Sequence, residues 1–194
     1  MVGGAVTVPP REVLAAYTRQ AIEIHDEWDS PHSFQTLHWD GEKIACRTYA
    51  CIMPDISPAQ YPKVMAGIAA EQREKAPDDP AYAYLLQIES FGMTEPGPDA
   101  GEAERDRYHR ARLGRTFHEQ PDAVEAAVAW CADIHGRLWS AEKTRGRPGE
   151  ITEHFYPPHA RRVGGQMIDG LIAVAYATGM ADYGLPGPHS AGAN

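Results

Sequence analysis

A tight-turn dipeptide, Asp40-Gly41, lies between two runs rich in β-branched and aromatic residues, and this pattern restricts the fold more than any other in the sequence. Asp-Gly tolerates the positive φ of a two-residue hairpin turn, so we predict an antiparallel hairpin over residues 34–52, with these two residues as the turn. Strict alternation along its second strand then places Cys46 and Cys51 on opposite faces of the sheet.

Residues 121–145 contain a second predicted hairpin. Their first half is ambiguous, because its apolar residues have helical spacing but also alternate as in a strand. We interpret this half as a strand, since His135-Gly136 downstream can form a hairpin turn. That turn would place Trp130 and Trp139 on the same face of a two-stranded ribbon.

Two further segments complete the predicted sheet. Residues 82–91 are apolar, aromatic and bounded by Pro and Gly, as in a buried central strand, and residues 150–158 form a short further strand. Helices are predicted over residues 11–28, 55–76 and about 161–178. The apolar stripe of the first helix is predicted to be Val13, Tyr17, Ala21, Ile24 and Trp28.

The pattern predicts an α+β fold. We expect a single domain with an antiparallel sheet of about five strands, made of two hairpins plus a buried strand, and covered by three main helices. The domain is expected to cover residues 9–182, with flexible segments at 1–8 and 183–194. The layout suggests two similar halves, over residues 9–93 and 116–182. A loop or helix over residues 94–115 would join them.

Composition restricts the class of protein. The chain is 43% hydrophobic and 23% charged, as expected of a globular domain. No apolar run approaches the roughly 20 residues that cross a bilayer, and residues 1–10 lack the pattern of a secretion signal. The three cysteines are an odd number without CxxC spacing, which favours reduced thiols. We expect a cytoplasmic protein with no membrane partner.

The net charge of −9 argues against a nucleic-acid partner. Residues 104–115 are the most basic segment, with five arginines, but at helical spacing these arginines spread around the helix and alternate with acidic residues. A solvated helix with ion pairs is the better interpretation.

The common catalytic motifs are absent from the sequence: GxxxxGK[ST], GxSxG and HExxH do not occur, and no GxGxxG follows a strand. The sequence therefore gives no motif evidence for a nucleotide-binding site, for the nucleophile elbow of a hydrolase or for a zincin-type metal site.

The segment HDEWDSPH, residues 25–32, holds the candidate metal ligands His25, Asp29 and His32. The first two are four residues apart and would share a helix face, and the third lies one turn further, which is ligand spacing for a divalent metal. Pro31 disfavours continuation of the helix, so we favour a solvated helix end. We expect no cofactor, and a divalent metal at these residues is the alternative.

Residues 117–122 hold candidate catalytic residues. His118, Glu119 and Asp122 could supply an acid, a base or a metal ligand. A polar connector beside a proline explains them equally simply, so no catalytic residue is assigned.

The leading functional prediction is a non-enzymatic interaction protein that self-associates or binds another protein. This prediction depends on the lack of a complete catalytic constellation, on the unusually apolar last helix and on the four tryptophans. The predicted interface residues are Trp130, Trp139, Tyr156, Met167, Leu171 and Val174.

Two alternatives stay open. A small metal-dependent hydrolase would use His25 and Asp29 with His118 or Glu119, which requires these residues to converge in one pocket. A component of a larger viral or cellular assembly would have chain ends that become ordered against neighbouring subunits.

Overall fold

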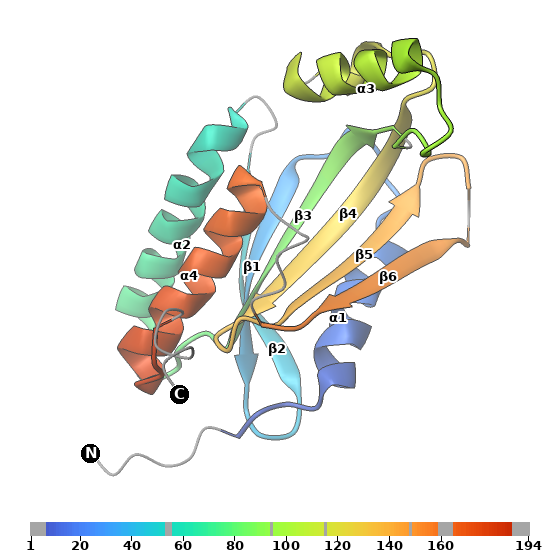
Figure 1. Cartoon of the computed structure of the whole chain (residues 1–194). Coiled ribbons are helices and arrows are strands. Elements are labelled where there is room, and N and C mark those ends of the chain that lie inside the picture. The colour runs from blue at the N-terminus through green and yellow to red at the C-terminus, as the bar shows by residue number, and fades with distance from the viewer. Residues whose placement is uncertain are drawn as a thin grey trace.

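The computed structural model describes residues 7–52, 56–93, 95–114, 116–147, 149–158 and 165–187. Within this part of the chain, four α-helices and a six-stranded antiparallel sheet form a single α+β domain (Figure 1). The predicted fold class is confirmed, and the predicted numbers of strands and main helices are approximately right. The elements are α1 (Arg11–Glu23), β1 (His32–Trp39), β2 (Ile44–Ile52), η1 (Pro58–Gln60), α2 (Tyr61–Lys75), β3 (Ala83–Gly92), α3 (Glu102–Gly114), η2 (Phe117–Glu119), β4 (Val124–Asp133), β5 (Leu138–Thr144), β6 (Ile151–Tyr156) and α4 (Gln166–Tyr183).

The sheet has the strand order β2-β1-β3-β4-β5-β6, so β2 and β6 are the edge strands. Helices α2 and α4 lie side by side on one face, and α1 packs across β4, β5 and β6 on the other (Figure 1). The third helix, α3, lies beyond the end of the strands. None of the helices among the described residues is both long and apolar enough to span a bilayer.

Strand β3 is buried on both faces, which explains its almost continuous run of apolar residues. Tyr84 and Leu86 belong to the core beneath α2 and α4. Ala83 and Leu85 point the other way, into the core beneath α1. The helix layers on either side therefore pack against the same strand.

The first hairpin turn is centred one residue later than predicted. The amide of Asp40 donates to the carbonyl of Lys43, so the two turn residues are Gly41-Glu42, and Gly41 has a φ of 100°. Glycine at the first turn position suits a type II′ turn. The Asp40 carboxylate accepts hydrogen bonds from the amides of Glu42 and Lys43, which stabilises this arrangement.

A β-bulge in β2 overturns the prediction that Cys46 and Cys51 lie on opposite faces of the sheet. Leu37 pairs with Cys46 but Thr36 pairs with Thr48, so Arg47 is an extra residue without a partner in the ladder. The side-chain alternation changes phase at this point. Cys46 and Cys51 therefore lie on the same face of the sheet, not on opposite faces.

Residues 121–145 form the predicted second hairpin, but its loop has three residues instead of two. The amide of Asp133 donates to the carbonyl of Arg137 at 3.1 Å, which leaves residues 134–136 as the loop. Gly136 adopts a φ of 76° and packs against the ring of Tyr176. The additional residue shifts the pairing, so that Cys131 lies opposite Trp139. Trp130 and Trp139 consequently lie on opposite faces of the sheet, so the prediction that they share a face is wrong.

Helix α1 ends at Glu23 and not at Trp28 as predicted. Its buried face also differs from the predicted stripe, because Ile24 follows the helix and is 71% exposed. Trp28 lies in the loop that follows and is partly buried against the core beneath α1. The buried residues of this helix are Leu14, Thr18, Ala21 and Ile22.

Helix α4 starts and ends about five residues later than predicted, and its C-terminal cap is Gly184, with a φ of 66°. Tyr183 and Leu185 pack against the core beneath α1, so the predicted flexible tail is packed at its start. Residues 188–194 of that tail, residues 1–6 of the predicted flexible lead and the predicted helix start at residues 161–164 lie outside the described residues.

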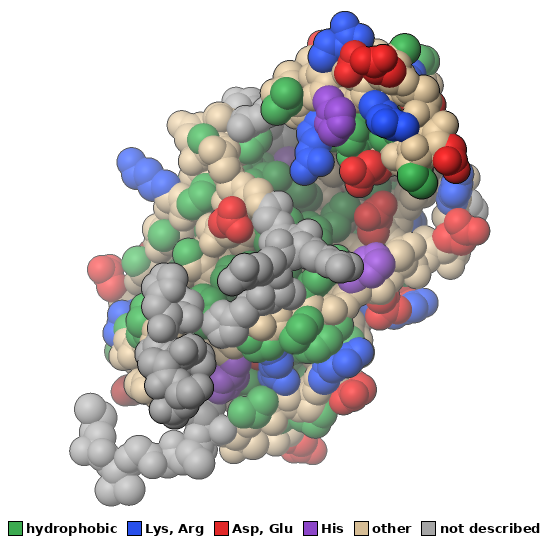
Figure 2. Space-filling model, viewed as in Figure 1, with side chains coloured by type: hydrophobic (Ala, Val, Ile, Leu, Met, Phe, Trp, Pro, Cys, Tyr) green, Lys and Arg blue, Asp and Glu red, His purple; other side chains and the backbone are tan. Residues whose placement is uncertain are grey.

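Most of α3 is exposed, and Tyr108 and Ala111 are its buried residues. Figure 2 shows basic and acidic side chains interleaved over this helix rather than a basic patch. Arg107 forms an ion pair of 2.7 Å with Asp122.

Candidate ligand-binding pocket

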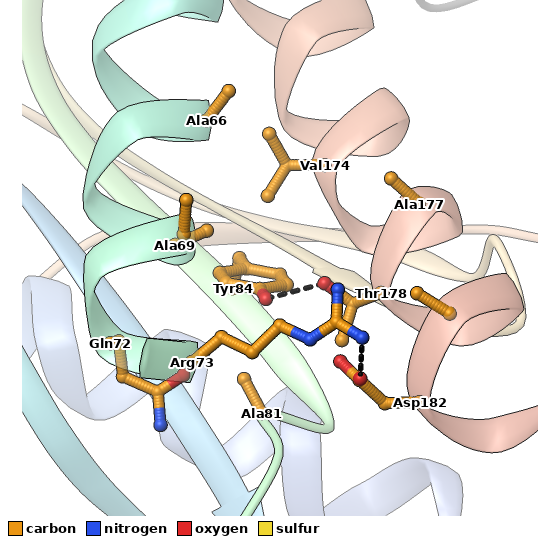
Figure 3. Close-up of a pocket in the computed structure, with 12 residues that line it drawn as sticks. Ala66, Ala69, Gln72, Arg73, Ala81, Tyr84, Val174, Ala177, Thr178 and Asp182 are labelled. Atoms are coloured by element: carbon orange, nitrogen blue, oxygen red, sulfur yellow. Dashed lines mark hydrogen bonds and ion pairs between the residues drawn. The ribbon is translucent and has the colours of Figure 1, made fainter. Parts of the chain in front are cut away.

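The helices α2 and α4 enclose a pocket at one end and touch at the other. At their N-terminal ends Gly170 lies directly against Pro62, since a Cβ on Gly170 would be 2.7 Å from the proline Cγ. At their C-terminal ends Arg73 forms an ion pair of 2.6 Å with Asp182. The helices therefore run parallel, and a hollow of about 250 Å³ lies between their C-terminal halves (Figure 3).

Small side chains form the walls of this α2–α4 pocket. Tyr84 and Ala81 contribute the floor, at the start of β3. The hollow exists because alanines face each other where larger residues would fill the space between two helices. The residues that define the pocket are Ala66, Ala69, Ala70, Gln72, Arg73, Ala81, Tyr84, Val174, Ala177, Thr178, Ala181 and Asp182.

Polar groups gather at one end of the pocket. The Arg73 side chain extends from α2 across the mouth towards Asp182 of α4 (Figure 3). Beneath this ion pair, the hydroxyls of Tyr84 and Thr178 form a hydrogen bond of 2.6 Å. An apolar body with a few convergent polar groups is typical of small-molecule sites.

The Tyr84 hydroxyl stays protonated at neutral pH. Burial is the main cause that raises its pKa, and the nearby Asp182 carboxylate raises it further. The hydrogen bond with Thr178 and the charge of Arg73 lower the pKa, but they are smaller effects. The two hydroxyls carry two protons and share one hydrogen bond, so one O–H remains able to donate to a ligand.

The polar side chains of the pocket offer both donors and acceptors of hydrogen bonds. Its twelve lining residues include no His, Cys, Ser or Lys. Arg73, Tyr84 and Thr178 can donate hydrogen bonds, and Asp182 can accept them.

Two other hollows have larger volumes but fewer walls. One of about 600 Å³ is lined only by Ile56 and residues of η1 and α2. Another of about 340 Å³ lies on the sheet and its end loops, without a helical wall. Neither of these hollows lies between two helices, as the α2–α4 pocket does.

The structure separates the predicted metal ligands. The ring of His32 contacts the hydroxyl of Tyr61 on the α2 side of the sheet. His25 lies on the α1 side, where its Nε2 is 3.0 Å from a carboxylate oxygen of Glu89. The backbone amide of Asp29 donates to the same carboxylate at 2.7 Å. His25 and Asp29 therefore meet at the Glu89 carboxylate, whereas the His32 ring lies on the other face of the sheet.

Asp29 also belongs to an acidic cluster that the sequence did not predict. Its carboxylate and those of Glu89 and Glu125 have oxygens within 4.8 Å of one another, the one such group of His, Cys, Asp or Glu found among the described residues. A cation already lies among them, since Arg145 binds Glu125 at 2.7 Å and Asp29 at 3.5 Å. This network ties the loop after α1 to β3, β4 and β5.

The predicted catalytic candidates lie on the surface around η2. The ring of His118 is 54% exposed, with its Nε2 3.7 Å from the carboxylate of the equally exposed Glu119. Asp122 is engaged with Arg107. His118 and Glu119 contribute no ligand atom to the acidic cluster, so the described residues do not assemble the centre that the hydrolase alternative requires.

The predicted interface residues divide into two groups. Trp139, Leu171 and Val174 are buried in the protein's own core, and Val174 also lines the α2–α4 pocket. Trp130, Tyr156 and Met167 are half-buried and pack against the edge of the core beneath α2 and α4. The rings of Trp130 and Tyr156 are 6.0 Å apart.

The sequence analysis did not predict the polar pocket residues, which are Gln72, Arg73, Tyr84, Thr178 and Asp182. A usable signal was present, because Ala66, Ala69, Ala70 and Arg73 follow helical spacing and mark a face of small residues. That signal does not say which other helix carries the opposing face.

Comparison with protein-family models, with curated proteins and with solved structures gives no match, so the function must be inferred from this chain's own geometry.

Proposed function

We propose that this protein is a non-enzymatic binding protein that takes a small, largely apolar ligand into the α2–α4 pocket. One observation carries the proposal. Alanines on two parallel helices face each other across a hollow of about 250 Å³ with two hydroxyls at its floor. Close packing is the rule in protein interiors, so a hollow of this size that ends on aligned polar groups favours a ligand.

The volume fits a ligand built on one ring. An engineered apolar cavity of about 150 Å³ in another protein binds benzene, so the larger α2–α4 pocket can hold a ring with a polar substituent. The ring would lie between Ala66 and Val174, and the substituent would reach the hydroxyls of Tyr84 and Thr178.

Benzyl alcohol is a suitable neutral probe, and its binding can be followed by the backbone amide NMR shifts of the full chain. We expect millimolar benzyl alcohol to shift the amides of α2, α4 and residues 81–84. Ala177→Leu should abolish these shifts, because leucine at this lining position fills the pocket. Ala173→Leu is the matched control, since residue 173 is exposed on the same helix and does not line the pocket. Absence of shifts in the unmodified protein, or equal shifts in Ala177→Leu, would contradict the proposal.

The proposed location is the cytosol. Its support is the state of the three cysteines, which are free, with Cys46 and Cys51 exposed. Exposed thiols persist in a reducing compartment.

Self-association is a second candidate function, and the half-buried aromatic patch favours it. This patch consists of Trp130, His154 and Tyr156, in which the rings of Trp130 and His154 both pack against that of Tyr156. It adjoins β6, an edge strand, and two copies of such an edge can meet about a two-fold axis. Sedimentation velocity of the Trp130→Ala variant tests this candidate.

A further inference from the structure

The charged groups at the pocket mouth indicate which ligand chemistry the pocket selects. Arg73 is 52% exposed, whereas its partner Asp182 is only 13% exposed. The contact uses one terminal nitrogen of the guanidinium, and Asp182 is its one carboxylate partner among the described residues. A guanidinium has five N–H donors, so Arg73 retains donors for a second acceptor.

We propose that the α2–α4 pocket selects small monocarboxylates, with the ligand carboxylate on Arg73 and its apolar body between the alanines. This inference rests on the proposed binding function and names the ligand class. A carboxylate at the mouth would receive charge-assisted N–H donors from Arg73 and the remaining O–H donor of the Tyr84 and Thr178 pair.

The same geometry disfavours a cationic ligand. An amine would have to reach Asp182, which is mostly covered, and would compete there with Arg73. A carboxylate can instead use the free edge of the guanidinium while the ion pair stays intact. The lining residues carry no charge other than these two, so Arg73 is the group that decides the preference.

The ligand orientation follows from the positions of the walls. The polar groups lie at the C-terminal ends of α2 and α4, and Ala66 and Val174 lie further towards the closed end (Figure 3). The apolar body therefore points towards the contact of Pro62 with Gly170. Substituents that lengthen this body would meet the closed end of the pocket.

The test compares sodium benzoate, benzyl alcohol and benzylamine, which share one ring and differ in charge. In NMR titrations of the full chain we expect benzoate to bind about 10-fold more tightly than the other two. Arg73→Met, which keeps the apolar stem of the side chain, should remove the advantage of benzoate over benzyl alcohol, whereas a variant outside the pocket should retain it. Lys75→Met is the matched control, because this exposed cation lies on the same helix outside the pocket.

A second measurement does not depend on any variant. Added salt should weaken the binding of benzoate to the unmodified protein and leave the binding of benzyl alcohol unchanged. If benzyl alcohol binds and benzoate binds no more tightly, or benzylamine binds best, the carboxylate inference is overturned and the proposed binding function stands. If none of the three probes binds, the proposed function itself fails.

Discussion

Gly170 lies so close to Pro62 that a Cβ at this position would be 2.7 Å from Cγ and 2.9 Å from the backbone Cα of the proline. The backbone of α2 cannot move aside for a new methyl group, as the end of a flexible side chain could. This contact holds the N-terminal ends of α2 and α4 together, and the pocket begins where the contact ends.

The first prediction concerns this contact. Gly170→Ala should lower the free energy of unfolding by about 1–3 kcal/mol, because the new methyl group forces the two helices apart. The intrinsic helix preference of alanine offsets only part of this cost. Chemical denaturation followed by circular dichroism measures the effect.

Gly67→Ala is the control for that measurement. Gly67 lies within α2, and a Cβ there would meet nothing within 4 Å. The substitution should stabilise the protein by up to about 1 kcal/mol through helix preference alone. A Gly170→Ala variant as stable as Gly67→Ala would show that the helices are not held at this contact.

The sequence predicted the fold class because hairpin turns and alternation are local signals. It failed where one residue changes the phase of the alternation. The bulge at Arg47 moved Cys46 and Cys51 onto one face, and the three-residue loop after β4 separated Trp130 from Trp139. Neither irregularity changes the composition of its strand, so the apolar pattern could not reveal it.

The pocket could not be predicted from the sequence for a different reason. Its walls come from α2 and α4, which are about a hundred residues apart, and its floor is Tyr84. The small residues of α2 are visible in the sequence as a face, but an alanine face can equally indicate tight helix packing. The contact of Gly170 with Pro62 joins the two helices at their N-terminal ends only, and no sequence pattern indicates that these two residues meet.

The second prediction concerns pH. His38 is buried, with Nδ1 3.0 Å from the Asp79 carboxylate and Nε2 3.3 Å from the Thr36 hydroxyl. Burial is the main cause that lowers its pKa, Arg47 lowers it further, and Asp79 opposes them in part. The unfolded chain therefore binds a proton at a higher pH than the folded protein, and stability is lost as the pH falls through this window.

The measurement is the free energy of unfolding at about pH 7.5 and about pH 5, on either side of the ordinary histidine pKa. His38→Gln should lose less stability between these two conditions than the unmodified protein. Burial also lowers the pKa of His32 and His135, so part of the loss should remain. His118→Gln serves as the exposed control. An unchanged loss in His38→Gln would mean that His38 does not contribute to the acid sensitivity.

The third prediction separates the two tryptophans that the loop after β4 places on opposite faces. Trp139 is 2% exposed, and its ring packs against Phe155 at 5.4 Å and lies beneath the guanidinium of Arg137. Trp139→Ala should therefore lower the free energy of unfolding by about 3–5 kcal/mol, as for other buried aromatic residues.

Trp130 is only half-buried, so Trp130→Ala should cost clearly less stability than Trp139→Ala while it removes the largest ring of the aromatic patch. If two copies associate through this patch, sedimentation velocity should show a dimer for the unmodified protein and a monomer for Trp130→Ala. Trp130→Phe, which keeps an aromatic ring, should retain part of the association. A monomer in all cases, or a dimer that survives in Trp130→Ala, would exclude the patch as the contact surface. Because the patch and the α2–α4 pocket share no residue, this result would leave the ligand-binding proposal unaffected.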